Sequence, residues 1–290
     1  MTRALDSDFV ARYGRPPAKT TTDKAISLHE NVRALLGDVE YASVLQGSYK
    51  NDTALATMND VDVLTVSRHA KHDWYRAPNW PEIFSGIERK LESDRRYAGK
   101  WTRKDKCIRL ATEVSIDVVP AVHHGDPIAD PISVYSFSTG TMRKNWPRGH
   151  HDAAAKKSAA TNGAFKQTVR LYKRWARCRF GTAKTAPSYY LECLIYSLPN
   201  AMFSGDLPLD FYTLGREIER RHASAWGVGS LARLAGDGDL LSGGEWAPSV
   251  FRTFLAELAS SLTDVRQALD ETDGTRAKAA WRRAFSGHEP

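Results

Sequence analysis

Two kinds of hydrophobic pattern alternate in the first half of the chain. Apolar residues at helical spacing predict helices over residues 25–37 and 80–91. Short runs rich in aliphatic and β-branched residues predict strands, at residues 41–47, 61–67, 107–112 and 114–122. Helices that alternate with strands in this order are typical of a lobe with a mixed β-sheet.

From Pro147 onward the pattern is helical only. Helices are predicted at residues 164–180, 188–203, 211–223 and 249–269, and the glycine-rich stretch 236–246 predicts a loop. The sequence therefore predicts an α+β protein with two lobes. Residues 1–146 would form the sheet lobe, and residues 147–290 would form a helical lobe packed against it, with a cleft between them.

Polar positions interrupt the apolar pattern at the two central strands. Asp60 and Asp62 flank Val61, and Asp117 alternates with Ile116 and Val118. Side chains two residues apart on a strand point to the same face. If the two strands are neighbours, the three carboxylates converge on one place.

Three like charges so close together need a cation, because each would otherwise raise the pKa of the others. Carboxylates combined with substrate phosphates are the ligands that Mg²⁺ prefers. Two such ions about 4 Å apart are the usual device for phosphoryl and nucleotidyl transfer. A pair such as Asp60 and Asp62 is more often a turn or surface pair when it stands alone. Here Asp117 and an upstream Gly-Ser pair favour the metal site.

The Gly-Ser pair, Gly47 and Ser48, lies at a predicted turn between a strand and a short helix that ends by Ala54. Glycine lets the backbone approach a ligand closely. Free N–H groups at the start of a helix favour an anion such as phosphate. Ser48 can add a hydroxyl donor to a terminal phosphate.

The composition shows an excess of basic over acidic residues and adds little other information. The chain has 290 residues, with 41 Lys and Arg against 34 Asp and Glu, and a formal charge of +7. This excess suits an anionic partner without identifying one. The three cysteines are far apart and form neither a CxxC pair nor a disulfide framework. No membrane-spanning run or signal peptide is visible, so a cytoplasmic protein is expected.

A basic stripe runs along the predicted helix 164–180. Lys166, Arg170, Lys173 and Arg177 recur at helical spacing, and such a stripe alone favours a solvated face. The adjacent histidine pairs at 123–124 and 150–151 lack the spacing of zinc ligands.

Several motifs together resemble one family. Gly47-Ser48, then Asp60-Val-Asp62 on the next strand, then Asp117 on a later strand resemble the DNA polymerase β-like nucleotidyltransferases. The longer strings are similar to the cGAS/DncV-like nucleotidyltransferases (CD-NTases) of bacteria: QGSYKNDTA, SIDVVPA, NWPRGHHDAAAKKSAATNGAFKQTVRLYKRW and APSYYLECLIYSL. The likeness covers residues 41–198.

The resemblance implies a two-lobed nucleotidyltransferase fold and a cyclic di- or trinucleotide product made from nucleoside triphosphates as an anti-phage second messenger. Asp60, Asp62 and Asp117 would be catalytic and would hold two Mg²⁺ ions, with Mn²⁺ as a substitute. The expected nucleotide-binding residues are Gln46, Gly47, Ser48, Asn162, Lys173, Ser188 and Tyr189. Lys173 would hold the donor triphosphate. Ser188 would contact phosphate at a helix start, and Tyr189 could stack on the donor base.

The expected partners are NTPs, ATP among them, together with a regulatory protein and an effector that binds the product. Neither a membrane nor an obligatory nucleic acid is expected. Two alternatives remain open at this point. One is a nucleotidyltransferase that modifies tRNA, a protein or a small molecule. The other is an inactive nucleic-acid-binding relative, which would be expected to lose one of the three acids.

Overall fold

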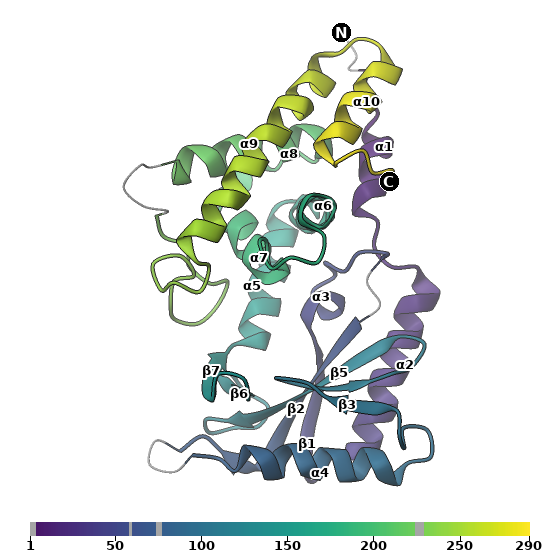
Figure 1. Ribbon diagram of the computed structural model, residues 1–290, viewed down its shortest axis with the longest axis vertical. Coiled ribbons are helices and arrows are strands. Elements are labelled where there is room, and N and C mark those ends of the chain that lie inside the picture. The colour runs from purple at the N-terminus through teal and green to yellow at the C-terminus, as the bar shows by residue number, and fades with distance from the viewer. Residues whose placement is uncertain (1–3, 58–59, 74–76, 224–228) are drawn as a thin grey trace. The chain divides into compact units, whose positions relative to one another are not determined.

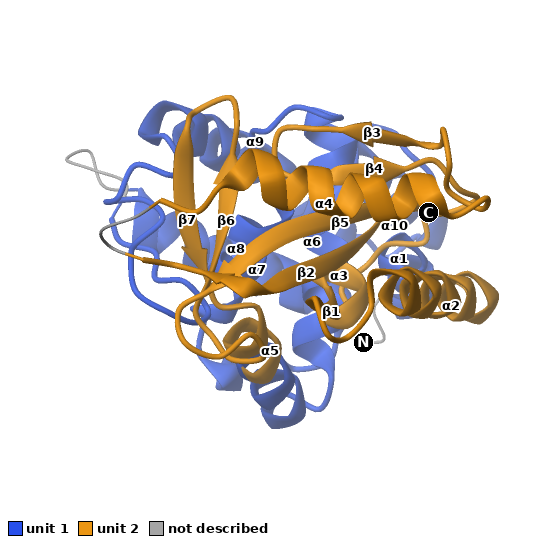
Figure 2. Ribbon diagram, turned by 90° about the horizontal axis from the view of Figure 1, so that it is seen from below, with its two compact units in different colours: residues 1–16, 153–290 blue, residues 17–152 orange. Residues whose placement is uncertain are grey.

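The computed structural model describes residues 4–57, 60–73, 77–223 and 229–290. The chain forms two compact units, residues 17–152 and residues 1–16 with 153–290 (Figure 2). We call them the sheet unit and the helical unit. The sequence placed the boundary at residue 146 and assigned the N-terminal residues to the sheet lobe. The units differ from that division because Phe9, Val10 and Tyr13 pack in the core of the helical unit. The functional division into two lobes stays a prediction.

The sheet unit contains one mixed sheet, with seven strands among the described residues (Figure 1). The strands are β1 (Tyr41–Gln46), β2 (Asp60–Lys71), β3 (Trp101–Arg103), β4 (Ile108–Leu110), β5 (Ser115–His123), β6 (Ile132–Ser136) and β7 (Thr141–Asn145). Their order is β1-β2-β5-β4-β3, and β6 pairs with both β5 and β7. β2 and β5 are parallel, whereas the other pairs are antiparallel.

One face of the sheet is covered by two helices, α2 (Lys19–Leu36) and α4 (Trp80–Ser93) (Figure 1). Val61 and Val63 of β2 and Ile116 and Val118 of β5 are fully buried in a cluster with side chains from both helices. The alternate positions of the same strands point to the opposite face. Packing against α2 and α4 therefore fixes which face carries the acids.

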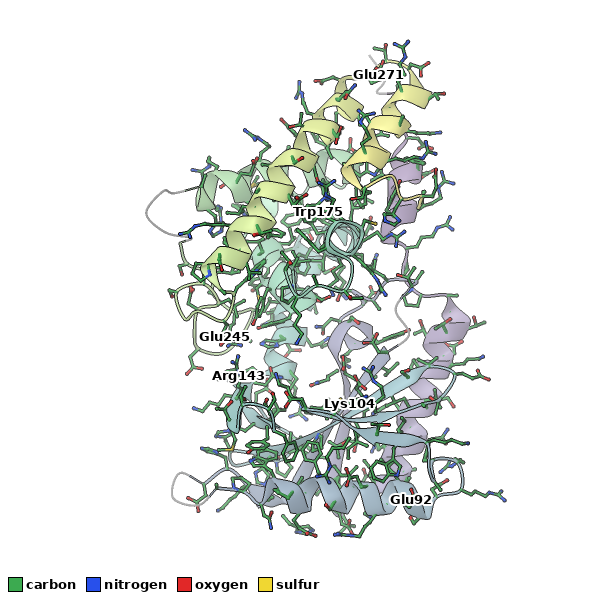
Figure 3. The ribbon with its side chains drawn as sticks, in the orientation of Figure 1. Glu92, Lys104, Arg143, Trp175, Glu245 and Glu271 are labelled. Carbon is green, nitrogen blue, oxygen red and sulfur yellow. The ribbon has the colours of Figure 1, made fainter. Side chains whose placement is uncertain are left out.

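The helical unit is built from α1 (Ser7–Ala11), α6 (Ala164–Phe180), α7 (Ser188–Tyr196), α8 (Leu207–His222), α9 (Pro248–Asp270) and α10 (Gly274–Ala284). Trp175 of α6 is fully buried among these helices (Figure 3). Its indole N–H donates to Ser261 Oγ at 2.9 Å. Tyr13 ties the N-terminal segment to the same core by donating to the carbonyl of His288 at 2.8 Å. α5 (Pro147–Ala160) contributes residues to both units.

The predicted α+β class is confirmed: one unit contains a mixed sheet with covering helices, and the other is built from helices. The helix predicted over 188–203 is too long, since α7 ends at Tyr196 before Pro199, which cannot continue a helix. The short helix after Gly47 ends at Lys50 rather than Ala54. The pattern also missed α10 and the short strands β3, β6 and β7. None of the described helices has the length and apolar character that a bilayer crossing requires.

Candidate active site

The two central carboxylates lie opposite each other on neighbouring strands. Asp62 on β2 is the register partner of Asp117 on the parallel strand β5, so both belong to one face of the sheet. Gln46 on β1 is opposite Asp62, and Arg109 on β4 is opposite Asp117. We call these four residues the polar row. The neighbouring positions on this face are apolar and form a small cluster of Ala42, Leu64, Val66, Ala121 and Ile132.

Asp60 is the first residue of β2 and is exposed. It lies two positions before Asp62, so the register places all three acids on one face. Burial, and then the charge of Asp60, raise the pKa of the Tyr49 hydroxyl on α3 (Gly47–Lys50). Asp60 therefore lies near the short helix that follows Gly47. The catalytic role of the three acids stays a prediction.

Gly47 brings its backbone unusually close to Asp62. Its φ angle is +72°, a region that favours glycine. A Cβ atom added to Gly47 would lie 2.1 Å from Asp62 Oδ2, well inside van der Waals contact. Any side chain at this position would therefore displace the carboxylate. Ser48 follows in α3, where its carbonyl accepts from the backbone N–H of Thr53 at 2.9 Å.

The sequence interpretation missed Arg109. Its Nε donates to Asp117 Oδ1 at 2.7 Å, and one terminal nitrogen donates to Oδ2 at 2.6 Å. These hydrogen bonds raise the pKa of the guanidinium above its ordinary value. Burial, and then the Asp117 charge, raise the pKa of the nearby Cys107 thiol to about 12. The available signal was the β4–β5 hairpin, because strands that pair antiparallel place Arg109 opposite Asp117.

The donor set of this face suits a divalent cation, since carboxylate and amide oxygens are hard ligands. The amide oxygen Oε1 of Gln46 is buried without a hydrogen-bond partner. Within the described ranges, no three carboxylate, imidazole or thiol groups are gathered closely enough to hold an ion. The Asp117 carboxylate is instead directed at Arg109. The residue types and the register fit a metal ion, and Arg109 occupies part of the coordination space.

In the helical unit, Lys173 on α6 forms an ion pair with Glu192 on α7. The two side chains are only 2% and 7% exposed. Ser188 and Glu192 are four residues apart on α7 and so share one side of that helix. The ion pair therefore directs Lys173 toward the side of α7 on which Ser188 begins the helix.

The remaining predicted nucleotide-binding residues have mixed surroundings. Ser188 is exposed, and Asn162 is exposed at the turn before α6 with a φ angle of +49°. Tyr189 is half-buried and packs against the helical core. Burial raises the pKa of its hydroxyl. The acids with Gln46, Gly47 and Ser48 belong to the sheet unit, whereas these residues and Lys173 belong to the helical unit.

The basic stripe on α6 is not the solvated face that its spacing favours. Arg170 and Lys173 are 8% and 4% exposed, while Arg177 is exposed and Lys166 is half-buried. Arg170 Nε donates to the carbonyl of Gly14 at 2.9 Å and so binds the N-terminal segment to α6. The inner residues of the stripe thus have partners inside the unit.

Comparison with known proteins finds one matching family and several similar proteins. Residues 152–263 match the family described as the cGAS/DncV-like nucleotidyltransferase C-terminal helical domain. A cyclic UMP-AMP synthase from Rhodothermus marinus is 28% identical over 243 residues, which is 73% of this chain and 83% of that protein. A cyclic AMP-AMP-AMP synthase from an Acinetobacter strain is 25% identical over 294 residues, covering 94% of this chain and 82% of that protein.

A solved structure extends the likeness to both units. The structure of the Rhodothermus marinus CdnE c-UMP-AMP synthase with Apcpp and Upnpp aligns with a TM-score of 0.70 and 25% identity. The alignment covers 93% of this chain and 99% of that one.

Proposed function

The chain belongs to the cGAS/DncV-like nucleotidyltransferases, and from this premise we propose that it makes a cyclic di- or trinucleotide from nucleoside triphosphates. One observation carries the proposal: Asp62 and Asp117 face each other in register on parallel strands, with Gly47 directly against Asp62. The similar proteins are named as synthases of cyclic nucleotides with two or with three nucleotides. They support the product class and leave its size open.

The acids of the sheet unit would hold the metal. Asp60, Asp62 and Asp117 supply the carboxylates, and we propose two Mg²⁺ ions, with Mn²⁺ as a substitute. Such ions, when bound, lower the pKa of the attacking hydroxyl and stabilise charge on the leaving oxygen. Gly47 has no side chain and so allows its backbone to lie directly against Asp62. Ser48 would add a hydroxyl donor to a phosphate. The side-chain amide oxygen of Gln46 is buried without a hydrogen-bond partner and would accept from the substrate.

We assign the donor nucleotide to the helical unit. Lys173 would neutralise phosphate charge, with Glu192 holding its ammonium group in place. Ser188 would donate to a phosphate from the first turn of α7, where backbone N–H groups have no helical partner. Tyr189 would stack on the base, and Asn162 would contact a base edge. Tyr189 is half-buried, so part of its side chain is accessible to solvent.

Ring closure requires that one enzyme join two or three nucleotides and then bring the free hydroxyl of the linear intermediate to the same carboxylates. We propose that the product is a second messenger in anti-phage defence, read by a separate effector protein. We also propose that a regulatory partner protein controls synthesis.

The test is incubation of the full chain with four labelled NTPs and Mg²⁺ or Mn²⁺, followed by mass spectrometry of phosphatase-resistant products. A cyclic product should form without RNA or protein acceptor. The Asp60→Ala/Asp62→Ala variant is the control and should give none. Label that enters only added tRNA or a protein band would contradict the cyclase and retain the nucleotidyltransferase.

A further inference from the structure

The pairing of the strands places Arg109 in the polar row, beside Asp117. It is the β4 partner of Asp117, which is in turn the β5 partner of Asp62. The Asp117 side chain is 12% exposed, whereas that of Arg109 is 44% exposed. The charge that balances Asp117 is therefore carried by a side chain that is itself accessible to solvent. The Arg109 guanidinium can therefore change its position when a metal ion or substrate binds the acids.

The hydrogen bonds use both oxygens of Asp117, at 2.7 and 2.6 Å. This fork fixes the plane of the carboxylate as well as its position, because a guanidinium is planar and donates in two parallel directions. An ionised carboxylate has about four lone-pair sites. The fork takes one site on each oxygen, and the Cys107 thiol is a further hydrogen-bond partner of the carboxylate. About one of the four sites therefore remains. Arg109 can therefore stay bound while Asp117 binds a further cation.

We propose that Arg109 is a positioning residue for Asp117: it holds the carboxylate in one orientation and weakens the affinity of the acids for divalent metal. The proposal rests on the metal-dependent function proposed above. The fork gives Asp117 a fixed direction, which the chemical step requires. The positive charge of Arg109 opposes a second cation at the same carboxylate, which limits metal binding when no nucleotide is present.

Two substitutions separate the two effects. Arg109→Gln removes the charge and the fork, so Mn²⁺ should bind about five- to tenfold more tightly, a small factor because the guanidinium is partly exposed. Its kcat should fall about tenfold or more, since Asp117 is no longer held. Arg109→Lys keeps the charge but not the fork. Its Mn²⁺ affinity should remain within about twofold of wild type while kcat falls about tenfold.

In the experiment, the full chain is titrated with Mn²⁺ alone. Binding is monitored by calorimetry or by electron paramagnetic resonance of the free ion. In parallel, kcat and KM for NTP consumption are measured, and thermal melting confirms that each variant folds. The matched control is Arg103→Gln. Arg103 makes the same two-pronged contact with Glu88, at 2.6 and 2.5 Å, and belongs to neither the polar row nor the nucleotide-binding residues. This control should lower Tm through loss of the Glu88 contact and leave Mn²⁺ affinity and kcat unchanged.

A further comparison places Arg109→Gln in an Asp117→Asn background, where it should change Mn²⁺ affinity less than it does in the wild-type background. The proposal is overturned if Arg109→Gln binds Mn²⁺ as wild type does or more weakly, or if its kcat is unchanged. If Arg109→Gln does not fold, Arg109→Lys decides alone, and wild-type kcat in that variant overturns the proposal. Because Mn²⁺ binding is measured without NTP, a failure here differs from the absence of a cyclic product, which would contradict the proposed function instead.

Discussion

Two ion pairs hold residues of the predicted site, and their surroundings are opposite. In the sheet unit, Asp117 is held by Arg109, whose side chain is 44% exposed. In the helical unit, Lys173 is held by Glu192, and both side chains are more than nine-tenths buried. An exposed partner can rearrange at low cost, whereas separating a buried pair leaves an unpaired charge in the core.

This difference in burial indicates what each ion pair contributes. The Arg109–Asp117 contact orients a carboxylate through a partner that is itself partly exposed. The Lys173–Glu192 pair joins α6 to α7 and is part of the structure of its unit. Mutations in the sheet unit should therefore change chemistry with little effect on folding. Mutations of the buried pair should first change stability.

The largest expected effect comes from removing two acids. Asp60→Ala/Asp62→Ala should lower turnover by about a thousandfold or more, since several kcal/mol of transition-state stabilisation would be lost. Tm should stay the same or rise, because the substitution relieves repulsion between like charges. Labelled-NTP turnover and thermal melting measure the two effects. Near-wild-type turnover would show that these carboxylates do not hold the metal.

The next effect tests the close approach at Gly47. Gly47→Ala places a methyl group on Asp62 Oδ2 and should lower kcat by about a hundredfold, as expected for a misplacement of about 1 Å. Gly37→Ala is the matched control, since Gly37 has a similar φ of +79° but open space around its Cβ position. Both variants should lose stability through the positive φ, by about 1 kcal/mol or more. Equal kcat in the two variants would contradict a role for the Gly47–Asp62 contact.

A smaller effect on function is expected at the buried pair. Lys173→Ala alone should cost about 3–5 kcal/mol of stability, because Glu192 is left as an uncompensated buried charge. Lys173→Met/Glu192→Met removes both charges at similar volume and should fold well. Its affinity for a non-hydrolysable ATP analogue with Mg²⁺, measured by calorimetry, should fall about tenfold through loss of a charge-assisted hydrogen bond.

Arg177→Ala is the control for that measurement, since Arg177 is exposed on the same helix. It should change the affinity for the analogue by less than about twofold. If the double variant binds the analogue as wild type does, Lys173 has a structural role only. If both variants lose affinity equally, the stripe acts through its overall charge.

Much of the sheet unit was predictable because strands encode their faces in alternate residues. Asp60, Asp62 and Asp117 could be placed on one face from the sequence alone. Arg109 needed one further step, the register of β4 on β5, which no turn motif in the sequence fixes. The pattern could predict that two strands pair but not which residues face each other.

The helical unit was less predictable because helical spacing defines a side of a helix and not its depth. Lys173 and Arg177 belong to one stripe, yet Lys173 is buried and Arg177 is exposed. Burial depends on α7, which supplies Glu192, and on the N-terminal segment, which covers Arg170. These contacts join residues far apart in the chain, so local pattern does not contain them.

The smallest expected effect concerns acid stability of the sheet unit. His29 on α2 is 8% exposed, and burial lowers its pKa below the ordinary value of 6.5, against an opposing effect of Glu30. As pH falls below about 6.5, His29 therefore takes up a proton in the unfolded chain before it does so in the folded chain. The free energy of unfolding should then drop by up to about 1.4 kcal/mol per pH unit, until His29 also protonates in the folded state. Above that pH both states are neutral and the contribution is constant. His29→Gln should flatten this slope when urea unfolding is followed between pH 7 and pH 5. Equal slopes in the variant and wild type would show that His29 does not set the acid stability of the unit that carries the polar row.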